Sequence, residues 1–197
     1  MALFTIKDLQ RPVKTKGSSA LNISGPGKYI IGKQHQKLTE IIKELPPEGE
    51  CLDIVSNGDW STHDLLFFIL QKTGPAEVYF TTWAISEFAI RQLYTFVNTG
   101  LITKLTGIFD YRNVTHKTAE LQFLKQITPE IKAVKIHAKV TVVQNAQWGI
   151  TIVGSANYTR NPRIEAGILR NSKKSAEFHK AWIMAEINNA SKFERNN

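Results

Sequence analysis

The chain has 197 residues, of which 42% are hydrophobic and 21% charged, values typical of one globular domain that exclude wholesale disorder. Lys and Arg number 25 against 17 Asp and Glu, a net charge of +8, and one cysteine, Cys51, excludes an internal disulfide and a cysteine-based zinc cluster. No apolar run reaches a membrane span and the N-terminus lacks the apolar core of a secretory signal, so we expect a cytoplasmic protein without membrane insertion.

The first segment, residues 1–45, is expected to form a basic N-terminal arm that ends in a helix. Residues 1–44 hold eight Lys and Arg against three Asp and Glu, and Lys14 and Lys16 are candidate nucleic-acid contacts. Apolar residues at helical spacing indicate a helix over 33–45, which Pro46-Pro47 ends.

Residues 46–190 are expected to form the main domain, followed by a short tail at 191–197. Strand and helix signals alternate through it, which favours an α/β fold with a mixed, mostly parallel sheet flanked by helices. The expected strands are 51–56, 76–83, 101–109, 131–143, 148–154 and 165–169, the fourth and fifth forming a hairpin, and the expected helices are 61–72, 86–98, 117–127 and 173–189.

Residues 110–180 carry the largest positive excess, with twelve Lys and Arg against five Asp and Glu. Such a segment attracts phosphate polyanions, so nucleic acid is a reasonable partner. The alternative, that these side chains only keep the surface soluble, is equally compatible with charge alone.

The segment KIHAKVTVV, residues 135–143, alternates polar and apolar residues. On a strand this alternation places His137 and Lys139 side by side on one face. A polar face turned to water would give the same pattern, so the segment alone does not define a site.

The next strand ends in GSAN, residues 154–157, where Gly154 permits a close backbone approach. Ser155 and Asn157 supply a hydroxyl and an amide, and a hairpin turn at 144–147 would bring them toward His137 and Lys139. An imidazole, an ammonium and neutral donors around one point suit a phosphate. Glu165 follows and is placed to orient the imidazole.

His137-x-Lys139, then Gly154-Ser155-x-Asn157, then Glu165 together resemble the HKD motif of the phospholipase D superfamily, in particular its single-motif, Nuc-like endonuclease branch. The resemblance covers about 140 residues, 48–187. Two features depart from the family pattern: Gln144 stands where the family carries an Asp, and the link to Gly154 is longer.

The resemblance implies a metal-independent phosphodiesterase with no cofactor, in which His137 attacks phosphorus and forms a phosphohistidine. It also implies that Lys139, Asn157 and Ser155 stabilise charge on the phosphoryl oxygens. Family members use two such motifs and this chain has one, so the resemblance implies a homodimer with two copies of His137 in one shared site.

Other candidates have weaker support. Ser61, His63 and Asp64 adjoin at a helix start, which indicates capping rather than a catalytic triad. Asp110 and Arg112 follow a strand and are candidates for lining the cleft. The remaining candidates for binding nucleic acid are Arg160, Arg163 and Lys135, whereas Trp148 and Trp182 are expected to pack in the core.

Three functions are compatible with these observations. The favoured one is a nuclease, acting on DNA more readily than on RNA. The second is a catalytically inactive nucleic-acid-binding protein of the same fold, which the replacement of the family Asp by Gln144 makes credible. The third is a phospholipid headgroup hydrolase, although nothing in the chain resembles an interfacial amphipathic helix.

Overall fold

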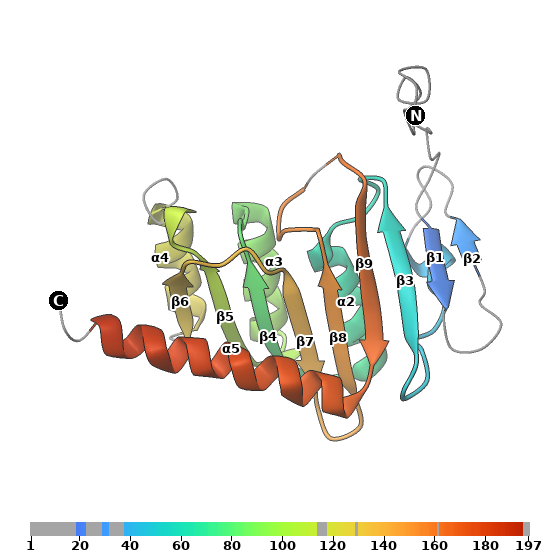
Figure 1. Ribbon diagram of the computed structural model, residues 1–197. Coiled ribbons are helices and arrows are strands. Elements are labelled where there is room, and N and C mark those ends of the chain that lie inside the picture. The colour runs from blue at the N-terminus through green and yellow to red at the C-terminus, as the bar shows by residue number, and fades with distance from the viewer. Residues whose placement is uncertain are drawn as a thin grey trace, which may run out of the picture.

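The computed structural model describes residues 19–22, 29–31, 38–113, 118–128, 130–160 and 162–194 (Figure 1). Strands and helices alternate through most of this range, as the sequence predicts. In chain order the elements are β1 (Ser19–Asn22), β2 (Tyr29–Ile31), α1 (Leu38–Ile41), β3 (Cys51–Ser56), α2 (Thr62–Thr73), β4 (Ala76–Thr82), α3 (Glu87–Asn98), β5 (Ile102–Asp110), a 3₁₀ turn (Tyr111–Asn113), α4 (Thr118–Ile127), β6 (Ile131–Val134), β7 (Val140–Gln144), β8 (Gly149–Gly154), β9 (Glu165–Asn171) and α5 (Lys173–Glu194).

The strands form one mixed sheet in the order β2-β1-β3-β9-β8-β7-β4-β5-β6. The expected α/β class and mixed sheet are confirmed. The expectation of mostly parallel pairing is wrong, because among the described strands only β4–β5 and β5–β6 are parallel neighbours. Short hairpin connections impose antiparallel pairing on β7–β8 and crossovers through helices give the two parallel pairs.

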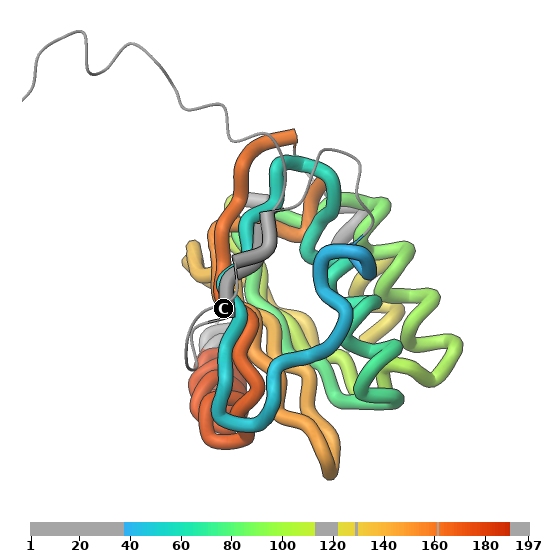
Figure 2. The backbone as a smooth tube through the Cα atoms, turned by 90° about the vertical axis from the view of Figure 1, so that its right-hand side faces the viewer, coloured from blue at the N-terminus to red at the C-terminus, as the bar shows by residue number. Residues whose placement is uncertain are grey.

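The sheet lies between two unequal helical layers (Figure 2). On one face α1, α2, α3 and α4 bury a large apolar cluster against the sheet, with Leu66, Ile90 and Phe80 fully buried in it. On the other face α5 alone covers a smaller cluster that includes Tyr79, Val142 and Ile183. Helices therefore bury much of both faces, but part of the face on the side of α5 stays open, because the paired Val153 on β8 and Ile168 on β9 are 41% and 38% exposed.

The helix ends follow the expected signals. Ser61 is the N-cap of α2, with its backbone N–H donating to the Asp64 carboxylate at 2.9 Å. Gly74 ends that helix with φ 74°, a conformation that glycine adopts without strain. The Ser86 hydroxyl accepts a hydrogen bond from Ala89 N at the start of α3. These caps confirm the expected boundaries of both helices.

The expected strand at 131–143 is wrong as one unit, because the structure divides it. Residues 131–134 form β6, which pairs with β5, and β7 begins only at Val140 and pairs with β4 and β8. The expected hairpin is thus formed by β7 and β8. Residues 135–139 cross between two strands at the edge of the sheet, and they include His137 and Lys139.

This crossing lies at the edge where β4, β5 and β8 end and β7 and β9 begin, at the top of the sheet in Figure 1. The register fixes the arrangement, because Val140 pairs with Thr81 on one side and with Val153 on the other. Ligands of α/β sheets usually bind at such an edge.

Within the described residues, no helix combines the length and the apolar content needed to cross a lipid bilayer.

Candidate active site

The crossing segment 135–139 is held by hydrogen bonds from side chains rather than by backbone pairing with a neighbouring strand. The Asp110 carboxylate accepts from Ile136 N at 3.2 Å. The Thr81 hydroxyl donates to Ala138 O at 3.0 Å and accepts from Val140 N at 3.1 Å. These bonds satisfy backbone groups that would otherwise be unpaired at the sheet edge, and they fix the segment that carries the imidazole.

The structure brings His137 and Lys139 together, as expected, although not on a regular strand. The Lys139 ammonium lies 3.4 Å from His137 Nδ1 and donates to the His137 carbonyl at 2.7 Å. His137 is exposed, whereas Lys139 is half-buried. Burial lowers the pKa of Lys139 below its ordinary value, and the nearby Glu165 carboxylate partly opposes that change.

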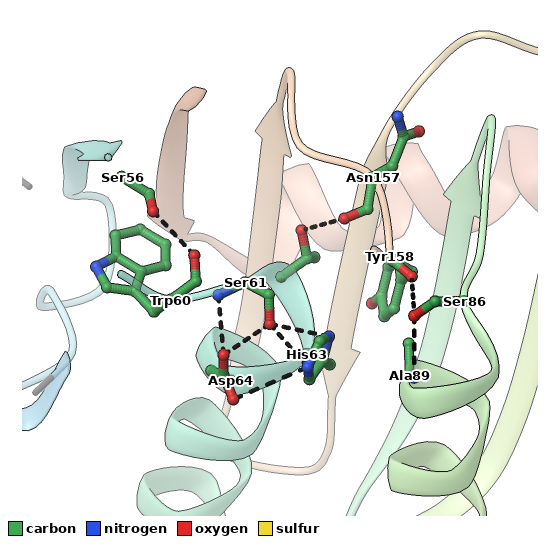
Figure 3. Close-up of polar contacts among 10 residues, drawn as sticks. Ser56, Trp60, Ser61, His63, Asp64, Ser86, Ala89, Asn157 and Tyr158 are labelled. Atoms are coloured by element: carbon green, nitrogen blue, oxygen red, sulfur yellow. Dashed lines mark hydrogen bonds and ion pairs between the residues drawn. The ribbon is translucent and has the colours of Figure 1, made fainter. Parts of the chain in front are cut away.

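The Asn157 side chain has its amide orientation set by three hydrogen bonds. Its Oδ1 accepts from the Thr82 hydroxyl at 3.2 Å, from Trp83 N at 3.1 Å and from Ala84 N at 3.2 Å. The NH₂ group is therefore the end of the amide that is turned outward to donate. Figure 3 shows this side chain directed away from the start of α2, while the Asn157 carbonyl accepts from Thr62 at 3.1 Å.

Ser155 and Glu165 contact each other across the β8–β9 connection. The Ser155 hydroxyl donates a short hydrogen bond to the Glu165 carboxylate and accepts from Ala166 N at 3.1 Å. Gly154 permits this close pairing, since a Cβ there would lie 2.8 Å from the Ala166 carbonyl. Ser155 therefore positions Glu165 in this structure, and the expected role of Glu165 in orienting His137 stays a prediction.

Trp83 lies beside His137 and Asn157 and was not among the residues expected there from the sequence. Its ring centroid lies 6.3 Å from that of His137, and its backbone N–H is bound by Asn157. Trp83 therefore contacts both halves of the predicted motif, His137 through its ring and Asn157 through its backbone. The available signal was its place directly after a buried strand, AEVYFTTW, at the carboxyl edge of the sheet.

Asp110 and Arg112 form an ion pair beside the crossing segment. The Asp110 side chain is fully buried, and its two oxygens accept from Arg112 Nε at 2.6 Å and Nη2 at 3.0 Å. Hydrogen bonds from Arg112, and from Ile136 N, lower the pKa of Asp110. The Arg112 guanidinium is 56% exposed, so the pair presents a fixed positive group at the expected edge.

The other predicted nucleic-acid contacts are distributed around this edge. Lys135 and Arg163 are exposed, and so is Arg160, whose guanidinium lies 4.2 Å from the centre of the Phe88 ring. Lys14 and Lys16, with most of the N-terminal arm, lie outside the described residues. β1, which belongs to the segment expected as that arm, pairs with β3 and extends the sheet.

Gln144, which replaces the family Asp, lies at the far end of β7 from Lys139. Its amide donates to Glu177 on α5. The next residue, Asn145, organises the turn between β7 and β8, with its Oδ1 accepting from Trp148 N at 2.9 Å. Gln144 therefore links the sheet to α5 and does not lie beside the imidazole.

The Ser61, His63 and Asp64 cluster at the start of α2 lacks the order of a catalytic triad (Figure 3). The Ser61 hydroxyl contacts both His63 Nδ1, at 2.9 Å, and the Asp64 carboxylate, at 2.6 Å, whereas a triad places the imidazole between the other two. His63 is 1% exposed, and its burial lowers its pKa. Capping is confirmed as the explanation of this cluster.

Two hollows adjoin the motif on the side of α2. One lies beneath Lys139 and is lined mainly by apolar residues such as Leu65, Ile152 and Tyr158. The other contains Arg160 but also three carboxylates, from Asp59, Asp64 and Glu165, so it suits a phosphate less well than the exposed side of His137. Across the described part of the chain, no three His, Cys, Asp or Glu side chains are grouped to hold a metal ion.

Comparison with known proteins gives likenesses among solved structures alone. No family model matches the sequence, and no curated protein matches it. Among solved structures, the chain is similar to Nuc from Salmonella typhimurium, a phospholipase D family member, with 16% sequence identity and a TM-score of 0.49 over 63% of this chain and 86% of that one. This likeness is too weak to assign the chain to that family.

Proposed function

We propose that the protein is a metal-independent phosphodiesterase, a nuclease that cleaves DNA or RNA through a phosphohistidine in a site shared by a homodimer. The observation that carries this proposal is the contact between the Lys139 ammonium and the His137 imidazole, 3.4 Å apart on an exposed sheet edge. A cation beside an accessible imidazole favours binding of a phosphate next to a nitrogen nucleophile.

In the proposed reaction an unprotonated nitrogen of His137 attacks phosphorus and forms a P–N bond. The P–O bond to one esterified oxygen breaks, and that oxygen leaves with a proton from a second imidazole. Lys139 and the outward NH₂ of Asn157 stabilise the charge on the remaining phosphoryl oxygens. Water then attacks phosphorus, gives its proton to the second imidazole, and the P–N bond breaks.

The second imidazole is proposed to be the partner subunit's His137. His35 is also followed two positions later by a lysine, Lys37, but the one Gly-Ser-x-Asn segment of the sequence comes after the His137-x-Lys139 pair. His63 is buried and occupied at the start of α2. A two-fold axis near the exposed His137 would place two identical groups at one phosphate. Ser155 and Glu165 are proposed as positioning residues within each half of that site.

Nucleic acid is the proposed partner, with DNA favoured over RNA. Support comes from the positive groups at the same edge, Arg112, Lys135, Arg160 and Arg163, which are spaced over several elements rather than around one phosphate. A repeated phosphodiester matches such an arrangement better than a single lipid headgroup does.

The test is cleavage of single- and double-stranded DNA and RNA by the purified protein in excess EDTA. We expect cleavage that persists in EDTA and is lost in His137→Ala. His179→Ala, which removes a histidine on α5 away from this edge, is the matched control and is expected to retain activity. Salt-sensitive binding without cleavage would contradict the proposal and support the inactive binding protein, and hydrolysis of phosphatidylcholine alone would support the lipid hydrolase.

A further inference from the structure

We propose that Trp83 is a base-stacking platform beside His137 and that the substrate is therefore single-stranded nucleic acid. This inference rests on the proposed function of the same site and names its substrate class. It comes from the position, exposure and fixation of one indole ring.

Trp83 differs from the other three tryptophans of the chain. Trp60 and Trp148 pack against the larger apolar cluster, and Trp182 packs against the smaller one beneath α5. Packing was expected from the sequence for Trp148 and Trp182. Trp83 instead keeps 36% of its surface exposed, although a large apolar side chain gains by being buried. An exposed indole at the edge where the motif lies is suited to contact a ligand.

The exposed indole is also held in a defined position. The turn from Thr82 to Ala84 that carries it is bound at three points by the Asn157 side chain. The ring itself contacts His137, and the Arg112 guanidinium lies 5.9 Å from its centre. Because the ring position is fixed before a ligand arrives, little conformational entropy is lost when a base stacks on it.

Two arginines lie against exposed aromatic rings in this part of the molecule. Arg112 is held beside Trp83 by its ion pair with Asp110. Five residues after Trp83, Phe88 lies under the Arg160 guanidinium at 4.2 Å and is 39% exposed. Alternating aromatic rings and cations form the kind of surface that binds single strands, with bases stacked on rings and phosphates near arginines.

A duplex does not fit this surface in the same way. Its bases are stacked on one another, so an indole beside the scissile phosphate reaches no base face without unstacking. A single strand offers a base next to the phosphate held by Lys139. Trp83 therefore favours a strand whose bases are unpaired.

The test measures binding in the His137→Ala background, which prevents cleavage, using labelled dT20, an abasic strand with the same number of phosphates, and the dT20·dA20 duplex at one salt concentration. Adding Trp83→Ala is expected to weaken dT20 binding about tenfold more than abasic-strand binding, and Trp83→Phe is expected to restore most of the loss. The matched control, Phe178→Ala, removes an aromatic ring that is 67% exposed on α5 and is expected to leave dT20 binding unchanged.

Equal weakening of dT20 and abasic strands by Trp83→Ala, or no weakening of either, would overturn the stacking role. Duplex binding as tight as dT20 binding would overturn the single-strand preference. A parallel series with rU20 separates RNA from DNA. Failure of the nuclease proposal is distinguishable, because it appears as absence of cleavage by the unmodified protein while the dependence of binding on Trp83 persists.

Discussion

The Lys139 ammonium donates to the carbonyl oxygen of His137 at 2.7 Å and lies 3.4 Å from Nδ1 of the same residue. One side chain therefore both fixes the backbone that carries the imidazole and places a positive charge beside the ring. This relationship predicts that Lys139 matters for the reaction more than for the fold.

Replacement of Lys139 by methionine separates these two contributions. Methionine keeps a long flexible side chain and removes the charge, so activity is expected to fall by about 10²–10³. Because burial disfavours the ammonium, as its lowered pKa indicates, the urea midpoint is expected to stay the same or rise. Circular dichroism and urea unfolding give the stability, and a variant that loses both activity and stability would contradict this assignment.

Asn157 gives a complementary pair of variants. Asn157→Asp keeps oxygen acceptors for Thr82, Trp83 and Ala84 but replaces the outward NH₂ with a negative oxygen, so it is expected to fold normally and lose more than about 10² in activity. Asn157→Ala leaves those donors without an acceptor and is expected to lower the unfolding free energy by about 1–3 kcal/mol. Full activity in Asn157→Asp would exclude the amide from phosphate binding.

Asp110 predicts a pH-dependent contribution to stability. Its pKa in the fold is lowered from 3.8, so its carboxylate stabilises the fold above pH 3.8, and this contribution is lost as the pH falls through the lower native pKa. Asp110→Asn is expected to reduce the unfolding free energy by about 2 kcal/mol at pH 7, with the difference shrinking below pH 3.8.

Urea unfolding at pH 7 and pH 3 measures that difference. Asp53→Asn, at a half-buried aspartate on β3, is the matched control and is expected to show a smaller change at pH 7. A deficit in Asp110→Asn that is the same at both pH values would mean that the stabilisation does not depend on the charge of the carboxylate.

The shared site predicts a particular result when active and inactive chains are mixed. If one phosphate requires His137 from both subunits, activity after subunit exchange with His137→Ala falls as the square of the active fraction. Mixing equal amounts would therefore leave about a quarter of the activity rather than a half. A linear decrease, or a monomeric protein that is fully active, would disprove the composite site.

The sequence predicted the local elements of the fold well where the signals lie within one segment. Strand β3 and the starts of α2 and α3 were expected close to where they lie, with capping predicted at Ser61, and the structure confirms them. The direction of strand pairing was predicted wrongly as mostly parallel, because it depends on which strands meet in space. β9, for example, pairs with β3 across more than a hundred residues of chain.

The site was predicted in part for the same reason. The proximity of His137 and Lys139 was expected from their spacing, but the alternation in KIHAKVTVV wrongly indicated a continuous strand. The backbone at 136–138 is bound instead by the Asp110 and Thr81 side chains, which come from other strands. Trp83 was missed because its closeness to Asn157 and His137 exists only after β4 and β7 are paired.

Detection of the covalent intermediate tests the central proposal most directly. The protein is mixed with an oligonucleotide in EDTA, quenched within one turnover in alkali, in which a P–N bond survives, and its peptides are analysed by mass spectrometry. We predict a nucleotide fragment attached to His137, absent from His137→Ala. Product formation with an unmodified His137 at every time within the turnover, or with the fragment on another residue, would contradict it.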